Sequence, residues 1–321
     1  MIEIQEVGSR LQAIKDQIAK VVVGKEEVVE QVLIALLASG HLILEDVPGT
    51  GKTLLAKSLA RSLQCDFKRV QFTADLLPSD ISGINFFNQQ AGRFELRRGP
   101  VFTNILLADE LNRATPRTQS SLLECMEERQ VTIDGDTYPL QKPFLVIATQ
   151  NPIENHGTFP LPEAQLDRFM MRVSMGYPSR DEETEILRRF MGRDPLPDLA
   201  PVLDQADIAR LQGNVPNVAC HPDVLQYLLS IVSATRTSDE IASGVSPRGS
   251  LQLVKAAQAR ALLRGRDYVS PDDVKALVSP VLAHRILLKD MLGSDHRRTE
   301  ALLAGIVAQI PVPSEPQLER R

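Results

Sequence analysis

The sequence contains few of the residues that mark some common classes of protein. Its 321 residues include no Trp, and aromatic residues make up only 4%. Proteins that bind single-stranded nucleic acid stack its bases on aromatic side chains, so the composition disfavours that class. The cysteines Cys65, Cys125 and Cys220 stand singly and far apart, a spacing typical of neither a disulfide framework nor a metal site. We interpret all three as small buried apolar residues.

Long apolar stretches and blocks of positive charge are absent as well. The longest apolar runs, Val32–Ala38 and Val101–Ala108, are too short or too interrupted to cross a bilayer, and no signal pattern opens the sequence. The formal net charge is −5 and no run of Lys or Arg occurs, so the electrostatic footprint of duplex binding is missing. We expect a cytoplasmic protein without membrane insertion, for which nucleic acid is not the favoured partner.

What the chain does contain is the mixture of a globular protein, with 43% hydrophobic and 24% charged residues. Its length favours two domains. Strands and helices are predicted to alternate up to residue 178, which indicates an α/β fold with a mostly parallel sheet flanked by helices. From residue 179 to 310 the pattern is helical with Pro and Gly breaks, which predicts a small all-α domain. Residues 311–321, with prolines and charged ends, are expected to form a flexible tail. The predicted strands are His41–Leu44, Phe67–Phe72, Ile105–Ala108 and Phe144–Ala148.

Two segments between these strands resemble β-hairpins. Gly83–Leu96 and Val131–Leu140 alternate in polarity and contain turn residues, among them Asp134 and Gly135. Hairpins that project from a core can contact partners, but simple surface loops explain the pattern equally well.

The segment Asp46–Thr53 carries the strongest chemical signal, because it follows a predicted strand and opens a predicted helix. It resembles a Walker A loop. Gly49 and Gly51 allow the backbone N–H groups to face phosphates, Lys52 can reach the β- and γ-phosphates, and the Thr53 hydroxyl can ligate Mg²⁺.

One position of this loop departs from the usual pattern, because Asp46 stands where Gly is the rule. An acid that pointed inward would repel phosphate, so we expect the Asp46 side chain to face away and the Pro48 turn to shape the loop.

Polar residues follow two later strands. Asp109 and Glu110 end the run Ile105–Ala108, as a Walker B segment requires: Asp109 would hold Mg²⁺ and Glu110 would polarise the attacking water. Asn151 follows the strand Phe144–Ala148 and could orient that water. Taken separately, the two acids could be helix caps, and Asn151 could simply start a turn before Pro152.

Together these motifs resemble the MoxR family of AAA+ ATPases, in the helix-2-insert group. The resemblance covers about Val21 to Leu288, and its fold is an AAA+ P-loop core with a small all-α lid domain. It is carried by Asp46–Thr53, Leu107–Glu110, Ala148–Pro152 and Leu161–Phe169.

The resemblance also implies roles for two arginines. Arg168 matches the arginine finger that enters the nucleotide site of the next subunit, although a salt bridge to Asp167 or Glu163 is the plainer alternative. Ser246 and Pro247 are typical of a helix start, and Arg248 after them matches the sensor-2 position, expected to reach a phosphate of the same subunit. Its alternative is a pair with a nearby carboxylate.

Motifs and resemblance together predict ATP and Mg²⁺ as cofactors. The predicted catalytic residues are Lys52, Glu110, Asn151, Arg168 and Arg248. The predicted Mg²⁺ ligands are Thr53 and Asp109. The predicted nucleotide contacts are Val22, Val23, Gly24, Pro48, Gly49, Thr50, Gly51, Lys52, Thr53, Leu54, Asp109 and Arg248, of which Val22 to Gly24 would lie along adenine.

The resemblance implies a homo-oligomeric ring, expected to be a hexamer, that hydrolyses ATP. Its expected work is chaperone-like remodelling, maturation or metal-cofactor assembly of protein clients, with a partner that carries a von Willebrand factor A domain. Two alternatives stay open: a DNA-dependent, helicase-like motor, and an ATP-gated binding scaffold that does not hydrolyse.

Overall fold

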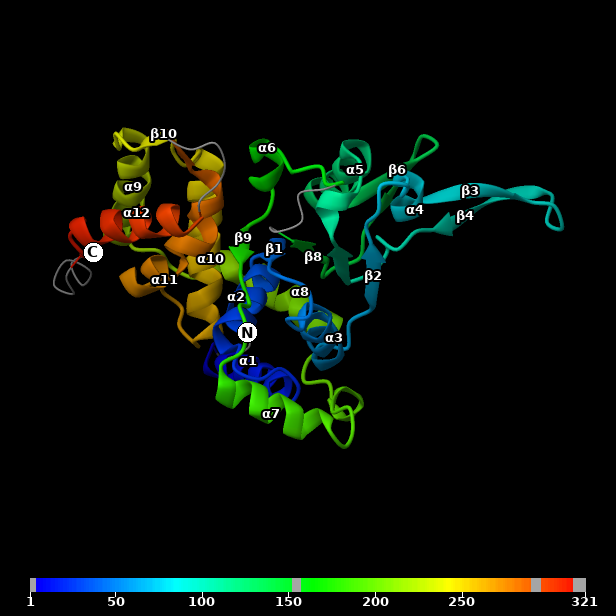
Figure 1. Ribbon diagram of the computed structural model, residues 1–321, viewed down its shortest axis with the longest axis horizontal. Helices are drawn as coiled ribbons and strands as arrows, with labels where there is room; N and C mark the ends of the chain where they lie inside the picture. Colours follow the sequence, from blue (N-terminus) through cyan, green and yellow to red (C-terminus); the bar gives the residue numbers. More distant parts are fainter. Residues whose placement is uncertain (1–3, 152–156, 290–295, 314–321) are drawn as a thin grey trace.

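A five-stranded parallel sheet forms the centre of the N-terminal half (Figure 1). The computed structural model describes residues 4–151, 157–289 and 296–313. The strand order is β2-β5-β8-β1-β9, so the chain crosses from β1 to the edge strand β2, returns through β5 and β8 to the side of β1, and ends at the opposite edge with β9. The predicted strands are confirmed within one or two residues, and the observed bounds are β1 Leu42–Glu45, β2 Phe67–Gln71, β5 Ile105–Asp109, β8 Leu145–Gln150 and β9 Met171–Val173.

Alternate residues of the central strands enter two separate cores, one on each face of the sheet. In β5, for example, Leu107 joins the first core and Leu106 joins the second. Buried residues of α1, α2 and α3 belong to the first core, and those of α5 to the second. Both faces of the sheet are therefore covered, which explains why the strands β1, β5 and β8 in its middle are mainly apolar and buried. The helices of this half are α1 Ile4–Ala19, α2 Glu26–Leu37, α3 Lys52–Ser62, α4 Pro78–Ser82, the 3₁₀ turn η1 Leu111–Arg113, α5 Pro116–Glu128 and α6 Glu163–Leu166.

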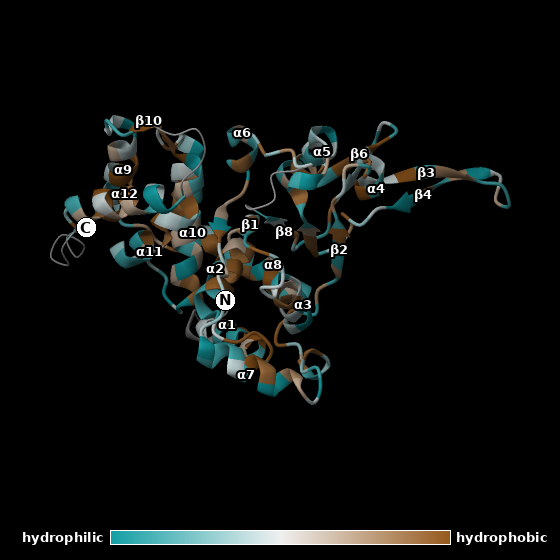
Figure 2. Cartoon of the chain, viewed as in Figure 1, coloured by the Kyte–Doolittle hydropathy of each residue, from teal (hydrophilic) through white to brown (hydrophobic). Residues whose placement is uncertain are grey.

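Both predicted hairpins are present. Strands β3 (Gly83–Asn88) and β4 (Arg93–Arg98) form an antiparallel pair that projects from the body of the protein, and β6 (Gln130–Ile133) pairs with β7 (Asp136–Pro139). Figure 2 shows apolar residues along the projecting pair.

Two details shape the β3–β4 hairpin. At its base, a Cβ on Gly83 or on Gly99 would collide with backbone atoms of the facing segment, so the two chains are pinched together there. Towards its tip, the rings of Phe87 and Phe94 meet edge to face at 5.3 Å between centroids, yet these residues are 52% and 71% exposed.

The C-terminal part is mainly helical, as predicted, with a short antiparallel pair of β10 (Ile241–Ser243) and β11 (Leu287–Leu288). The Ser hydroxyls at 246 and 270 cap α10 and α11 by accepting hydrogen bonds from the N–H groups of Gly249 and Asp273. The helices are α7 Arg180–Phe190, α8 Gln205–Asn214, α9 Pro222–Thr237, α10 Pro247–Leu263, α11 Pro271–Leu282 and α12 His296–Gln309, with 3₁₀ turns η2 Leu196–Asp198, η3 Val215–Asn217 and η4 Ala283–Arg285.

The segment that follows residue 179 first packs on the core and only later enters the helical bundle. The side chain of Gln212 in α8 donates a hydrogen bond to the carbonyl of Leu36 in α2, at 2.7 Å. The N–H of Val202 donates to the carbonyl of Ser62 in α3, at 2.8 Å. The division at residue 178 stays a proposal, and most of the predicted tail, residues 314–321, lies outside the described residues.

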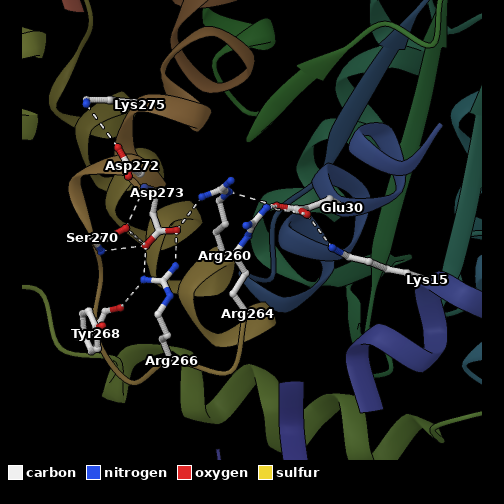
Figure 3. A network of polar contacts seen from close by, with 10 residues as sticks. All are labelled: Lys15, Glu30, Arg260, Arg264, Arg266, Tyr268, Ser270, Asp272, Asp273 and Lys275. Carbon is white, nitrogen blue, oxygen red and sulfur yellow. Dashed lines mark hydrogen bonds and ion pairs between the residues drawn. The ribbon is translucent and has the colours of Figure 1, made fainter. Parts of the chain in front are cut away.

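A chain of charged side chains joins the helical bundle to the N-terminal helices (Figure 3). Glu30 of α2 binds Lys15 of α1 at 2.6 Å and Arg260 of α10 at 3.2 Å. Arg260 also binds the fully buried Asp273 of α11 at 2.8 Å, and Arg266 binds the same carboxylate at 2.7 Å. Four helices from both parts of the chain are thus connected by ion pairs.

The cysteines differ from the expectation in part. Cys125 is buried, but Cys65 and Cys220 are only partly buried and pack at the margin of the first core. Burial raises the pKa of the Cys65 and Cys125 thiols to about 12. Across the described residues, every helix is too short or too polar to cross a membrane.

Candidate nucleotide site

The loop between β1 and α3 has the shape of a phosphate-binding loop. Gly49 and Gly51 have φ values of +86° and +92°, a region in which residues with a Cβ are strained. Gly51 is the N-cap of α3 and provides no capping side chain. The first N–H groups of α3 therefore need partners from outside the helix, and their partial positive charge favours an anion.

Lys52 lies folded over this loop. Its ammonium donates hydrogen bonds to the carbonyls of Asp46 and Val47 at 2.9 and 3.0 Å. Burial lowers the pKa of Lys52, whereas the carboxylates of Asp46, Asp109 and Glu110 oppose that shift. A charged phosphate oxygen is a stronger acceptor for this ammonium than a neutral carbonyl oxygen.

The Asp46 side chain faces away from the loop, as predicted from its charge. It accepts hydrogen bonds from the Ser174 hydroxyl at 2.9 Å, from the N–H of Gly176 at 3.1 Å and from the N–H of Met175. The carboxylate thereby fastens the phosphate loop to the segment after β9. An acid at this position is compatible with an anion site because its charge is used on the opposite side.

The two strand-end acids are held in place by Thr149 of the neighbouring strand β8. The Thr149 hydroxyl donates to Asp109 at 2.6 Å and accepts from the N–H of Glu110 at 2.8 Å. Glu110 adopts the left-handed conformation, with φ of +55°, which is uncommon for a residue with a Cβ and typical of functional sites.

Strand β2 contributes two residues that the sequence analysis missed. Arg69 binds Asp109 through two nitrogens at 2.6 and 3.0 Å, and the Gln71 amide donates to Glu110 at 2.7 Å. Arg113 also binds Glu110, at 2.9 Å. The sequence did contain a signal for them. Arg69 and Gln71 stand two positions apart near the end of a predicted strand, so their side chains are expected to lie on the same face of that strand.

These groups meet in a cleft of about 410 Å³, within the usual size of a ligand site. Its chemistry fits a magnesium–nucleotide complex. Mg²⁺ is usually held by one or two protein groups together with phosphate oxygens, and Thr53 and Asp109 both line the cleft. Among the described residues, no group of three or more His, Cys, Asp or Glu is placed to hold a metal. The lining residues are Asp46, Pro48, Gly49, Gly51, Lys52, Thr53, Leu54, Arg69, Gln71, Asp109, Glu110, Thr149, Gln150 and Asn151.

The other predicted contacts of the loop and of adenine, Thr50 and residues 22–24, are not among the residues that line this cleft. The Thr50 hydroxyl donates to the carbonyl of Val47 within the loop. Val22 is buried in the first core, as its apolar character alone would predict. Gly24 has φ of +67° and lies against the Glu182 side chain. The role of residues 22–24 at adenine stays a prediction.

The two predicted phosphate-binding arginines lie together, away from the cleft. Arg168 and Arg248 both bind Glu127 at the end of α5, at 3.3 and 3.0 Å. This placement differs from the expected reach of Arg248 to the phosphates of its own subunit, because α10 presents Arg248 to α5 and to Asp167. For Arg248, the carboxylate pairing given as the alternative is what this chain shows by itself, whereas Arg168 pairs with Glu127, a different carboxylate from the expected Asp167 or Glu163. The roles of both arginines at a phosphate stay predictions.

Comparisons with known proteins agree with this geometry. Residues 41–171 match the family model described as ATPase family associated with various cellular activities, and residues 233–305 match an AAA lid domain. The uncharacterized protein YeaC of Bacillus subtilis is 49% identical, with 93% of each chain covered. Chaperone MoxR1 of Mycobacterium tuberculosis is 43% identical, over 92% of this chain and 81% of its own.

A solved structure supports the same assignment over nearly the whole chain. A crystal structure from Cytophaga hutchinsonii superposes with a TM-score of 0.89 at 37% identity, and 97% of each chain is covered. The phosphate loop and the strand-end acids lie within the residues that match the ATPase family model, and α10 and α11 lie within those that match the lid model. The chain therefore belongs to the MoxR family of AAA+ ATPases.

Proposed function

We propose that this protein hydrolyses ATP with Mg²⁺ inside an oligomeric ring and uses the cycle to remodel protein clients. The supporting observation is that one cleft brings together the phosphate loop, Lys52 and the acids Asp109 and Glu110. Such a site can bind a triphosphate and activate water against it.

Each residue of the cleft has a distinct task in this proposal. Lys52 binds the β- and γ-phosphates, while Thr53 and Asp109 would hold Mg²⁺, which neutralises charge on the phosphates. Glu110 takes the proton of the attacking water, and Asn151 orients that water. The contacts of Asp109 and Glu110 with Arg69 and Gln71 must loosen before both acids can act.

The ring is proposed because the cleft of one chain lacks an arginine for the γ-phosphate in its described lining beyond Arg69, which is bound to Asp109. Arg168 and Arg248 lie together on another part of the surface. A second copy can supply both guanidinium groups in trans, and a closed ring, a hexamer in our proposal, gives every cleft such a neighbour.

The client role draws on the relative named as a chaperone and on the exposed hairpin β3–β4. An aromatic pair that stays exposed on a projecting arm favours contact with another protein. The von Willebrand factor A domain partner, the assembly of metal cofactors and the cytoplasmic location belong to the proposal through the MoxR family alone.

One experiment tests the enzymatic part. Steady-state phosphate release with Mg²⁺-ATP is measured against protein concentration for the wild type and for Glu110→Gln. We expect the rate per subunit to rise with concentration in the wild type and to fall at least about 100-fold in the variant, because the base is lost. Nucleotide binding, followed by a fluorescent analogue, should persist in Glu110→Gln.

The outcomes separate this proposal from its alternatives. Nucleotide binding without phosphate release at any concentration supports the ATP-gated scaffold. The hairpin also carries Arg93, Arg97 and Arg98, so a DNA-dependent motor has one structural feature in its favour. Turnover that DNA stimulates and that falls steeply with salt supports that motor.

A further inference from the structure

The turn that carries Arg168 is bound to the lid through the η4 residue Arg285, next to which His284 also contacts the Phe169 carbonyl at 3.1 Å. Arg285 in η4 is almost fully buried, with its side chain 2% exposed, and it donates to the Asp167 carboxylate at 2.8 Å. The same guanidinium donates to the carbonyls of Asp167 and Phe169 at 3.1 and 2.6 Å. These acceptors lie directly before and after Arg168, so the backbone on both sides of the finger is tied to the lid.

A second contact joins the finger to the lid through its side chain. One carboxylate oxygen of Glu127 accepts from Arg168 at 3.3 Å, and the other accepts from Arg248 at 3.0 Å. Arg168 belongs to the core and Arg248 to the lid helix α10. Glu127 therefore holds two guanidinium groups from different parts of the chain close together.

The arginines near Glu127 outnumber the carboxylates, so this cluster carries a net positive charge that favours an anion. Arg168, Arg248 and Arg285 face the carboxylates of Glu127 and Asp167. The side chains of Glu127, Arg168 and Arg248 are all between 33% and 38% exposed, so a phosphate from outside the chain can reach both arginines. Two guanidinium groups placed side by side can bind separate oxygens of one phosphate.

We propose that Arg285 and Glu127 are positioning residues that mount the arginine finger on the lid, so that Arg168 and Arg248 approach the neighbour's nucleotide as one unit. The lid orientation of one subunit then sets turnover in the next. The inference rests on the proposed ATP hydrolysis in trans. Its physical reason is that a finger tied at its backbone and at its side chain cannot move independently of the lid.

A complementation experiment tests this inference. Donor subunits carry Glu110→Gln, which disables their own cleft, and acceptor subunits carry Arg168→Ala, which removes their own finger. Turnover in the mixture then arises where a donor finger meets an acceptor cleft. Adding Glu127→Gln to the donor should lower that turnover about tenfold, which corresponds to ~1.4 kcal/mol. The same change in the acceptor should have little effect, because its finger is already absent.

Three further donor variants sharpen the result. Glu128→Gln is the matched control, since Glu128 is the exposed neighbour on the same helix. Glu127→Asp keeps the charge and should restore part of the turnover. Arg285→Lys should also lower turnover, because one ammonium cannot reach the acceptors on both sides of Arg168, and its thermal melting point shows whether it folds.

The possible failures can be told apart. If the wild type turns over ATP but donor and acceptor do not complement each other, hydrolysis in trans is wrong, and this inference falls with it. If they complement each other and donor Glu127→Gln is as active as donor Glu128→Gln, only the positioning role is overturned. Equal losses from Glu127→Gln in donor and acceptor would indicate a structural role for Glu127 and would also overturn it.

Discussion

Asp46 shows how one residue can depart from a motif and still support it. Its carboxylate is 7% exposed and accepts three hydrogen bonds from the segment at residues 174–176. Glycine at this position could not tie the phosphate loop to the strand beside it. The acid therefore stabilises the loop from behind, while the loop's N–H groups remain available in front.

This role predicts that Asp46→Asn destabilises the protein where the phosphate loop is bound to residues 174–176. The amide keeps one acceptor oxygen, which can serve two of the three donors, so at least one donor such as the N–H of Met175 loses its partner and faces the amide NH₂ group. We expect the free energy of unfolding to fall by about 1–3 kcal/mol and nucleotide affinity to fall with it. Chemical denaturation and binding of a fluorescent ATP analogue measure the two effects. Asp239→Asn is the control, since Asp239 is exposed; a variant with wild-type stability would contradict the role.

Residues of the site differ in how far the sequence can predict them. The positions of the phosphate loop and of the acids at 109 and 110 could be predicted, because each motif consists of residues that are contiguous in the sequence. Arg69 contacts Asp109 across 40 positions of the sequence, through the order of strands in the sheet. Arg285 reaches Asp167 across 118 positions, through the docking of the lid. Such contacts depend on tertiary packing, so the local sequence does not identify the partner of either arginine.

At the scale of elements, the junction between α10, α11 and the N-terminal helices depends on buried charge (Figure 3). Burial alone raises the pKa of Asp273, but hydrogen bonds from Arg266 and Ser270 outweigh it and hold the pKa below its usual value. For Glu30, burial is likewise outweighed by Lys15 and Arg264, and its pKa is also lowered. Both carboxylates are therefore more acidic in the folded protein than in the unfolded chain.

The sign of these shifts predicts a loss of stability in acid. A carboxylate with a lowered folded pKa contributes its stabilisation above the unfolded pKa, about 4, and loses it as the pH falls through the folded value. Asp273→Asn leaves two arginines without their carboxylate and should cost about 3–5 kcal/mol at neutral pH. The variant should also show a flatter decline of stability below about pH 4.

Urea unfolding at several pH values measures both effects. Asp272→Asn is the matched control, because the neighbouring Asp272 side chain is 84% exposed. Equal stability of Asp273→Asn and Asp272→Asn would contradict the role of the buried network.

The elements themselves were largely predictable, for physical reasons that are local. Buried parallel strands are apolar on both faces, and the helix starts at Ser246 and Ser270 carry a cap followed by proline. The packing of α8 on α2 was not predictable, because both helices present apolar faces that could meet several partners. The short β10–β11 pair was missed since two or three residues give no period.

At the scale of the whole molecule, the hairpin β3–β4 is the part that reaches furthest from the body (Figure 2). The exposed rings of Phe87 and Phe94 contribute little buried area to the fold. The double change Phe87→Ser and Phe94→Ser should therefore alter the free energy of unfolding by under ~1 kcal/mol and leave basal ATP turnover intact.

The double variant should differ from the wild type in its binding of a client protein. We expect ATP-dependent binding of reduced, unfolded lactalbumin to fall several-fold, measured by co-sedimentation or fluorescence anisotropy. Met191→Ser is the control, because Met191 is 83% exposed on another element. Unchanged capture by the hairpin variant would remove the hairpin from the proposed client site.

The pinched base of this hairpin has a mechanical consequence. Where Gly83 and Gly99 meet, the two chains are too close for either residue to carry a Cβ, and this narrow base can serve as a fulcrum about which the paired strands rotate together. Six residues per strand give an arm of about 20 Å, and a rotation of about 10° at the fulcrum displaces its tip by about 3 Å. A small rotation at the base of the hairpin thus becomes, at its far end, a displacement of about the length of one residue of an extended chain.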